Sequence, residues 1–387
     1  MSEEEASIRA EDPSPLPAGR IDHPEGDSGL ESGRVLAGGW ALSDSGPPSE
    51  VLILINGRRT VTVPVGGPSP AATECHPGVP GSDRAGWSTW LDLPEAPMGV
   101  DIALLARVDP ANPGAMVTLD ERHFPPPAIE AGGSSAVFTI VQNEATFLPV
   151  WLDHYSRSFA PNDIYVLDHG STDGGTEGLE GRCNLLRVAH DATFDHTWLR
   201  AVVQDFQSFL LRSYDQVLFA EADELVVADP ATYDGLGDYL RRCDRISVAC
   251  TGYEVAERRG EAPIDFDRPL LAQRSHWRRS GLYSKRLLSR IPLRWNVGFH
   301  DEYNAPPDPP DPELLLLHLH RVDYQLCLDR HRASTARRWS EEDLRWNLGW
   351  QQRVVDPEEF DAWFYSEDYD RTKDTVEPIP ERFRDLF

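Results

Sequence analysis

The sequence has few cysteines and no cysteine motif. Its five cysteines are scattered through 387 residues, are odd in number, and form no Cys-x-x-Cys pair. A disulfide framework in a secreted domain needs an even set of cysteines, and a zinc site usually shows paired ones. The cysteine content therefore predicts neither feature, and it fits a reducing cytoplasm.

Long apolar runs and basic charge are also scarce. No run of about 18 apolar residues occurs, and the first residues carry neither the positive segment nor the apolar core of a leader peptide. The chain has 64 acidic against 37 basic residues, a net charge of −27. Such a surface repels nucleic acid and anionic lipid. We expect a soluble cytoplasmic protein with no transmembrane segment and no nucleic-acid partner.

The first third of the chain differs from the rest in composition and in the pattern of its apolar residues. Residues 1–32 are acidic and proline-rich with few large apolar side chains, which predicts disorder. Residues 33–124 consist of short apolar segments divided by turns, among them Asn56-Gly57, a pair typical of tight hairpins. These segments predict a small all-β sandwich domain. Residues 125–135, with prolines and then glycines and serines, predict a linker.

Residues 136–387 alternate apolar strands with helical patterns. This rhythm predicts an α/β domain in which helices flank a mainly parallel, Rossmann-like sheet, with a C-terminal helical extension. Ligands gather at the carboxyl ends of the strands in such sheets. Three polar clusters follow expected strands, and each could be an ordinary loop. Their shared position favours one composite site made of 142–144, 168–174 and 221–224.

The third cluster interrupts an apolar run from Val217 to Val227. Burying an unpaired carboxylate is costly, so Glu221 and Asp223 must face solvent or neutralise something. On an extended chain the two would point to the same side and could grip a hard divalent cation. The alternative is an acidic turn between two strands.

Taken together, residues 136–227 resemble a family-2-type nucleotide-sugar glycosyltransferase of the GT-A fold. Phe138-Thr-Ile-Val-Gln-Asn-Glu resembles the first strand and loop of that family. Asp168-His-Gly-Ser-Thr-Asp-Gly resembles its Asp-Asp-Gly-Ser-Thr-Asp-Gly signature, and Glu221-Ala-Asp223 stands where it carries an Asp-x-Asp metal motif. His169 and Glu221 depart from the pattern. The resemblance implies a nucleoside-diphosphate sugar donor, a hydroxyl acceptor, and Mn²⁺ or Mg²⁺.

The same resemblance suggests roles for individual residues. Glu221 and Asp223 would hold the ion, which neutralises the diphosphate leaving group. An alternative role for Asp173 is to cap the glycine turn that follows it. The expected donor-binding residues are Asn143, Glu144, Asp168, His169 and Asp173.

Two later segments add candidates. An inverting transfer needs a carboxylate base for the acceptor hydroxyl. In the related enzymes such a base follows the metal motif by a comparable stretch, so the resemblance implies Asp301 or Glu302, although a solvated acidic loop would look the same and a retaining enzyme needs no such base. His318 and His320 share a face at the end of a leucine run. Either could complete the metal shell, or both could be hydrogen-bonded strand-end histidines.

Two matters stay open in the sequence. The basic cluster 268–294 could face the diphosphate, but a solvated or salt-bridged face is the commoner explanation of any one of its residues. The departures at His169 and Glu221 also support a second function, a carbohydrate-binding or scaffold protein that has lost catalysis. In the first function the β-domain would be an accessory or oligomerisation module, which allows for a homo-oligomer.

Overall fold

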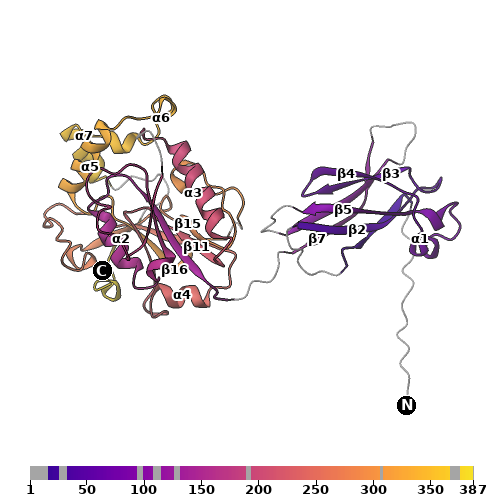
Figure 1. The fold of residues 1–387 in the computed structure, drawn as a ribbon, viewed down its shortest axis with the longest axis horizontal. Helices are drawn as coiled ribbons and strands as arrows, with labels where there is room; N and C mark the ends of the chain where they lie inside the picture. The colour runs from indigo at the N-terminus through magenta and orange to yellow at the C-terminus, as the bar shows by residue number, and fades with distance from the viewer. Residues whose placement is uncertain are drawn as a thin grey trace, which may run out of the picture. The chain divides into compact units, whose positions relative to one another are not determined.

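The structure is a computed structural model that describes residues 16–25, 33–93, 99–107, 115–125, 131–188, 193–305, 308–366 and 375–386. The chain divides into two compact units, Met1–Ala128 and Ile129–Phe387. Each unit has its own hydrophobic core, so the two are described separately (Figure 1).

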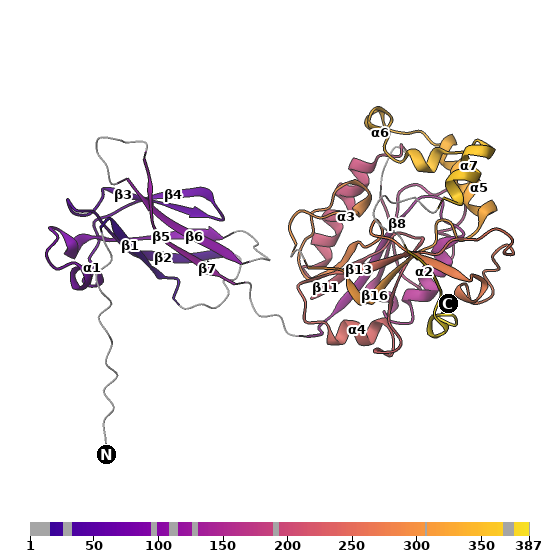
Figure 2. The ribbon, with the colours of Figure 1, turned by 180° about the vertical axis from the view of Figure 1, so that it is seen from behind.

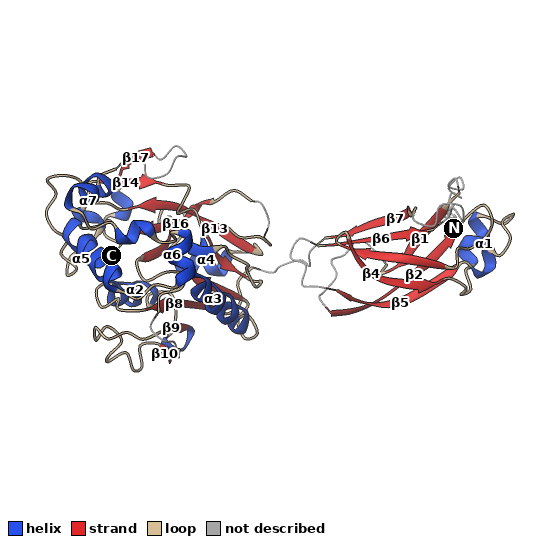
Figure 3. Ribbon diagram, turned by 90° about the horizontal axis from the view of Figure 1, so that it is seen from above, coloured by secondary structure: helices blue, strands red, loops and turns tan. Residues whose placement is uncertain are grey.

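The N-terminal unit consists of two antiparallel sheets, which Figure 3 shows in red. One has the order β1 (Ala18–His23), β2 (Gly33–Leu42) and β5 (Gly86–Leu93). The other has the order β4 (Arg58–Pro64), β3 (Glu50–Ile55), β6 (Val100–Ala106) and β7 (Val117–Phe124). A short helix, α1 (Pro70–Cys75), and a 3₁₀ turn at Ser82–Arg84 complete the described part of this unit.

The two sheets share one apolar core because inward side chains alternate with outward ones along each strand. Val51 and Ile53 of β3 and Ile102 of β6 pack with Trp87 and Leu91 of β5. The predicted hairpin is present, since β3 pairs with β4 across Asn56 and Gly57, whose φ angles are 50° and 72°. Strand β1 lies inside the segment expected to be disordered; the rest of that segment falls outside the described residues, apart from short flanks of β1.

The C-terminal unit is built on a ten-stranded sheet. Its main path runs β10-β9-β8-β11-β15-β13-β14-β17, and β16 pairs with β13 and with β12. The bounds are β8 Ser135–Val141, β9 Ile164–Asp168, β10 Asn184–Arg187, β11 Gln216–Phe219, β12 Glu224–Ala228, β13 Ser247–Glu254, β14 His276–Arg279, β15 Arg286–Ser289, β16 Asp311–His318 and β17 Thr375–Pro378.

The expectation of a mainly parallel, GT-A-type Rossmann sheet flanked by helices is wrong. The pairs among β10, β9, β8 and β11 are parallel, as is β13 with β16, but β15 runs antiparallel to both β11 and β13. Strands β12, β14 and β17 also pair in antiparallel fashion. The described residues contain more strand than helix. The antiparallel strands β14 and β15 come from the basic cluster, where four-residue strands containing arginine show no apolar pattern.

Six helices lie in the described part of this unit. They are α2 (Phe147–Tyr155), α3 (His196–Leu210), α4 (Leu236–Arg242), α5 (Tyr324–Ala336), α6 (Glu341–Trp346) and α7 (Pro357–Phe364). Figure 2 shows α2, α3 and α4 around the central strands, whereas α5, α6 and α7 (yellow) gather at one end of the unit. Short 3₁₀ turns lie at Pro161–Asp163, Leu271–Gln273, Val297–Phe299, Trp350–Arg353 and Glu381–Phe383.

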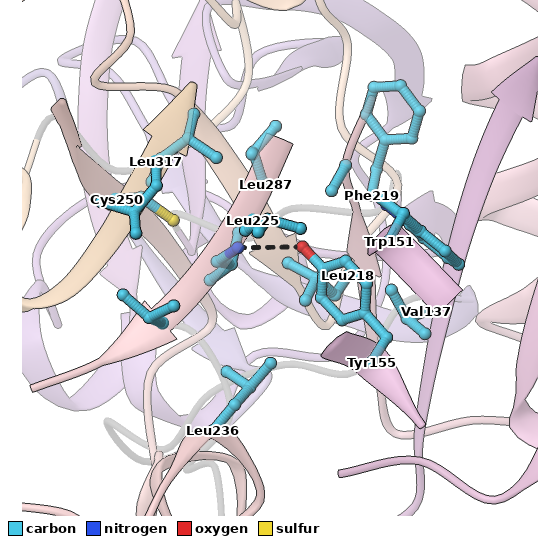
Figure 4. Packing of buried hydrophobic residues seen from close by; sticks show 14 of the residues in the cluster. Val137, Trp151, Tyr155, Leu218, Phe219, Leu225, Leu236, Cys250, Leu287 and Leu317 are labelled. Atoms are coloured by element: carbon cyan, nitrogen blue, oxygen red, sulfur yellow. Dashed lines mark hydrogen bonds between the residues drawn. The ribbon is translucent and has the colours of Figure 1, made fainter. Parts of the chain in front are cut away.

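The core of this unit fixes the strand that follows the acidic cluster. β12 pairs with β16 along one side, and helix α2 covers its other side. The backbone N–H of Val226 donates to the hydroxyl of Tyr155 at 3.0 Å (Figure 4). His154 Nε2 donates to the carbonyl of Val226 at 2.8 Å. Burial lowers the pKa of His154 to about 4, which keeps it neutral. The start of β12 is thereby held in place beside the site.

Candidate functional site

A pocket of about 280 Å³ opens where β8, β11 and β16 end, with α5 along its side. Its volume lies just below the range for small-molecule sites, about 300–1,000 Å³. The structure brings seven of the residues predicted from the sequence to this pocket. They are Asn143, Glu144, His169, Glu221, Asp223, His318 and His320.

The acidic segment is a turn, and it also lines the pocket. β11 ends at Phe219 and β12 begins at Glu224, whose N–H donates to the carbonyl of Glu221 at 2.9 Å. Because the chain turns here, Glu221 and Asp223 do not share one face of a strand. Their carboxylates pair with different cations: Glu221 with Lys285, and Asp223 with Arg330.

Lys285 forms a buried ion cluster behind the turn. Its Nζ lies 2.6 Å from Glu221 Oε2 and 2.7 Å from Glu224 Oε1, and its side chain is only 2% exposed. Burial raises the pKa of Glu224 even though Lys285 opposes the shift. Burial would lower the pKa of Lys285, but the two carboxylates outweigh it and raise that pKa. Lys285 therefore stays charged and neutralises the inner side of the acidic turn.

Arg330 of α5 joins the turn to the first loop. Its Nη1 donates to Asp223 Oδ2 and its Nη2 to Glu144 Oε1, both at 2.8 Å. Burial raises the pKa of Glu144, whereas for Asp223 burial is outweighed by Arg330 and by the neighbouring imidazoles, which hold the pKa of Asp223 well below its usual range. Of these two carboxylates, we assign the ionised one to Asp223, because several polar groups contact Asp223 whereas Glu144 is contacted mainly by Arg330.

The strand register brings two imidazoles to Asp223. Glu224 of β12 lies opposite His318 of β16, and the N–H of Leu319 donates to the carbonyl of Asp223 at 2.8 Å. The rings of His318 and His320 stack with centroids 5.8 Å apart. His320 Nδ1 lies 3.4 Å from Asp223 Oδ2. The predicted shared face of the two histidines is therefore present.

The two histidines differ in what holds them. His318 Nδ1 lies 3.1 Å from Glu254 Oε1, and this carboxylate outweighs burial and raises the pKa of His318. His320 Nε2 lies 3.1 Å from His331 Nε2. Burial lowers the pKa of His320, and it lowers that of His331 to about 3. Both are neutral at pH 7, so one ring donates the proton of this contact and the other accepts it.

Asp223, His318 and His320 have the geometry of an incomplete metal shell. One ligand atom from each lies within 4.8 Å of the others. A carboxylate with two imidazoles suits Mn²⁺ better than Mg²⁺, which prefers oxygen ligands and an octahedral shell. Glu221, expected as a second carboxylate ligand, instead contacts Lys285.

Three predicted donor-binding residues shape the loops beside the pocket. Asn143, whose φ is 63°, accepts from the N–H of Thr172 at 2.7 Å. Asp173 accepts from the N–H groups of Ala145 and Gly175, both at 2.9 Å, so the turn-capping alternative is present. Asp168 accepts from backbone N–H groups at Gly170 and Ser171 and from the hydroxyl of Thr176. The two loops are therefore bound to each other, with Asp168 and Asp173 outside the pocket lining.

The two predicted bases do not line the pocket. Glu302 accepts from Arg286 Nε at 2.8 Å, and Asp301 accepts from Asn296 Nδ2 at 2.7 Å. His300 lines it instead. Its Nδ1 donates to the carbonyl of Leu282 at 2.8 Å, and burial, with help from Lys285, lowers its pKa to about 4. A neutral ring held in this way leaves Nε2 as an acceptor.

Several residues of the site were not predicted as such. Lys285 belongs to the basic cluster, so the sequence contained a signal for it. Arg330, His331 and Arg337 line the pocket from α5 and its end. Arg330 is 107 residues from Asp223 along the chain, so no local spacing could have linked them.

Comparisons with known proteins add no family. No protein-family model matches the sequence, and no curated protein matches it. None of the helices in the described part of the chain combines the length and apolar character that crossing a bilayer requires.

Proposed function

We propose that this protein is a metal-dependent glycosyltransferase that moves a sugar from a nucleoside-diphosphate donor to a hydroxyl acceptor. One observation carries the proposal: a group of potential metal ligands lies beside three cations in one pocket. The group is Asp223, His318 and His320; the cations are Lys285, Arg330 and Arg337. The resemblance of residues 136–227 to nucleotide-sugar glycosyltransferases supports the same function.

This set suits a diphosphate leaving group. When bound, Mn²⁺ would neutralise charge that develops on the diphosphate without any proton transfer. Asp223, His318 and His320 would hold the ion, and the arginines offer bidentate contacts to phosphate oxygens. In the structure Arg330 forms an ion pair with Asp223. Its guanidinium would have to release that carboxylate to the ion; Nη1 could then bind a donor phosphate while Nη2 remains on Glu144.

His300 is the residue we propose to receive the acceptor proton. It lines the pocket, is kept unprotonated at neutral pH, and has Nε2 available as an acceptor. A general base must lie within hydrogen-bond reach of the hydroxyl, a condition that Asp301 and Glu302 do not meet in this pocket. Gly298, with φ of 79°, lets the ring lie close, because a Cβ there would be 3.0 Å from His300 Cδ2.

The test measures nucleotide binding and turnover together. UDP, GDP and dTDP are screened by thermal shift with and without Mn²⁺, since a ligand of the folded state raises the melting temperature. Hydrolysis of the matching nucleotide sugars is then assayed. We expect an Mn²⁺-dependent shift with one nucleotide and its loss in Asp223→Asn. Asp229→Asn is the control, because Asp229 pairs with Arg382 and does not line the pocket. Full turnover by Asp223→Asn in chelator would reject the proposal.

One observation favours the scaffold alternative. Glu221 and Asp223 are each neutralised by a cation of the chain, Lys285 and Arg330, so the carboxylates do not require a metal. A protein of this kind would bind sugars or nucleotides with no dependence on Mn²⁺ and would not hydrolyse any nucleotide sugar. The same screen separates the two functions.

A further inference from the structure

A second group of potential metal ligands lies deeper than the Asp223 set. Cys327 and His331 lie one turn apart on α5, and His320 lies just before the helix. Cys327 Sγ is 3.7 Å from His331 Nε2, and that nitrogen is 3.1 Å from His320 Nε2. The ligand atoms of all three lie within 4.8 Å of one another. We propose that Cys327, His331 and His320 form a zinc site.

The distances fit a tetrahedral ion. Zinc binds thiolate sulfur at about 2.3 Å and imidazole nitrogen at about 2.0–2.1 Å, so tetrahedral ligands would be separated by about 3.6 Å for sulfur to nitrogen and about 3.3 Å for nitrogen to nitrogen. Two of the three separations here, 3.7 Å from Cys327 Sγ to His331 Nε2 and 3.1 Å between the two Nε2 atoms, are within a few tenths of an ångström of these values. The third, from Cys327 Sγ to the His320 nitrogen, is within 4.8 Å.

The outer contact of His331 orients its imidazole towards the ion. His331 Nδ1 donates to the carbonyl of Val354 at 2.9 Å, which directs the lone pair of Nε2 inward. His320 Nδ1 lies 3.4 Å from Asp223 Oδ2 and accepts from Arg330 Nη1 at 3.2 Å, so His320 carries its proton on Nε2 and donates it to His331 Nε2. Zinc binding through His320 Nε2 requires this proton to move to Nδ1, where Asp223 can accept it. A carbonyl or carboxylate on the far nitrogen is the usual second contact of a zinc-bound histidine. Phe360 and Trp363 pack against His331 and shield the position.

The chemistry of the set selects zinc over manganese. A thiolate with two imidazoles is a soft ligand set, and Mn²⁺ stands at the weak end of the divalent affinity order. On binding, the S–H bond of Cys327 breaks, its proton leaves to solvent, and a zinc–sulfur bond forms. His320 and His331 line the pocket, so the fourth ligand position can be reached from there by water or by an anionic group.

The zinc position and the Asp223 set share His320. A neutral imidazole has one lone pair and so can bind one ion. If His320 binds zinc through Nε2, its Nδ1 carries the proton and cannot bind an ion that Asp223 holds. Zinc is therefore expected to compete with Mn²⁺ for this protein, although the two ions occupy different positions. The zinc site itself does not depend on the proposed transferase function.

The experiment titrates the full-length apo protein with Co²⁺ and then displaces it with Zn²⁺. Tetrahedral cobalt bound to a thiolate gives a near-ultraviolet charge-transfer band and strong visible bands. We expect one equivalent of Co²⁺ with both features, bleached by Zn²⁺. Cys327→Ser should lose the charge-transfer band, and His331→Gln should weaken Co²⁺ binding at least tenfold. Cys183→Ser is the control for an unrelated thiol, because Cys183 lies outside the pocket.

The outcomes separate this site from the transferase proposal. Absence of the charge-transfer band in the wild type, or its persistence in folded Cys327→Ser, would overturn the zinc site. Circular dichroism establishes that each variant is folded, and His331→Gln gives a second way to fail if Cys327→Ser does not fold. The spectrum needs no turnover, so Mn²⁺-dependent transfer without a cobalt spectrum rejects the zinc site alone. A cobalt spectrum without any nucleotide effect rejects the transferase alone.

Discussion

The acidic turn has two sides, and each side holds a carboxylate cluster around one cation. On the inner side, Lys285 neutralises Glu221 and Glu224 from a position that is 2% exposed. On the outer side, Arg330 neutralises Asp223 and Glu144, and its side chain is 22% exposed. The inner cation is enclosed, whereas the outer one lies against imidazoles that could take a metal with Asp223. We infer that Lys285 maintains the fold and that Arg330 fills an exchangeable cation position.

Replacing Lys285 should give the largest effect. Lys285→Met leaves Glu224, which is fully buried, without its cation. Breaking a buried pair from one side costs about 3–5 kcal/mol, because the remaining charge is uncompensated. We expect a loss of this size in the free energy of unfolding, measured by urea titration.

A double variant supplies the control for this prediction. In Lys285→Met with Glu224→Leu both buried charges are gone, so much of the lost stability should return. A single variant that loses less than about 1 kcal/mol would contradict a structural role for Lys285, because exposed ion pairs contribute no more than that.

Acid should weaken both clusters through their neighbouring histidines. The pKa of His300, beside Lys285, is lowered to about 4 and that of His331, beside His320, to about 3. A folded-state pKa below the unfolded value of about 6.5 means that the unfolded chain binds more protons. Stability is therefore complete above pH 6.5 and falls as the pH drops, to about pH 4 for His300 and about pH 3 for His331.

The pH dependence can be assigned to each cluster separately. Shifts of this size correspond to about 3–5 kcal/mol per histidine. Urea titrations at a series of pH values should show a shallower slope between pH 6.5 and 4 in His300→Gln and in His331→Gln than in the wild type. An unchanged slope in His300→Gln would mean that its ring is not buried and neutral beside Lys285.

The sequence located the acidic turn but not its cations. Local sequence patterns predict strands β8, β9 and β11, because each is an apolar run. The polar residues that follow these strands are equally visible in the sequence. The pairing of Arg330 with Asp223 spans 107 residues, and the strands β14 and β15 contain charged side chains that face buried partners. These contacts arise from tertiary packing, which overrides local pattern. For the same reason the parallel part of the sheet was expected and the antiparallel part was missed.

The geometry of the turn explains why Glu221 is not in the group of potential metal ligands. Its spacing suggested that Glu221 and Asp223 act together, which holds only for an extended chain. Because β11 ends at Phe219, the chain turns after it. The Glu221 carboxylate therefore lies in the Lys285 cluster and the Asp223 carboxylate in the Arg330 cluster. His318 and His320 were foreseen because an imidazole pair at a strand end needs partners, and the register of β12 on β16 supplies Asp223 as one of them.

Of these replacements, that of Arg330 should have the smallest effect on stability and the largest effect on ion binding. Arg330→Gln frees Asp223 from its guanidinium, so Mn²⁺ no longer has to displace a competing cation. We expect Mn²⁺ to bind about tenfold more tightly, since about 1.4 kcal/mol of competition is enough for that change, as measured by titration calorimetry. Nucleoside diphosphate should bind more weakly, because a phosphate contact is lost. Arg332→Gln is the matched control, since Arg332 lies on the same helix, is exposed, and pairs with Asp329. Weaker Mn²⁺ binding in Arg330→Gln than in Arg332→Gln would show that the two sides of the turn do not differ in this way, and that Arg330, like Lys285, holds the site together.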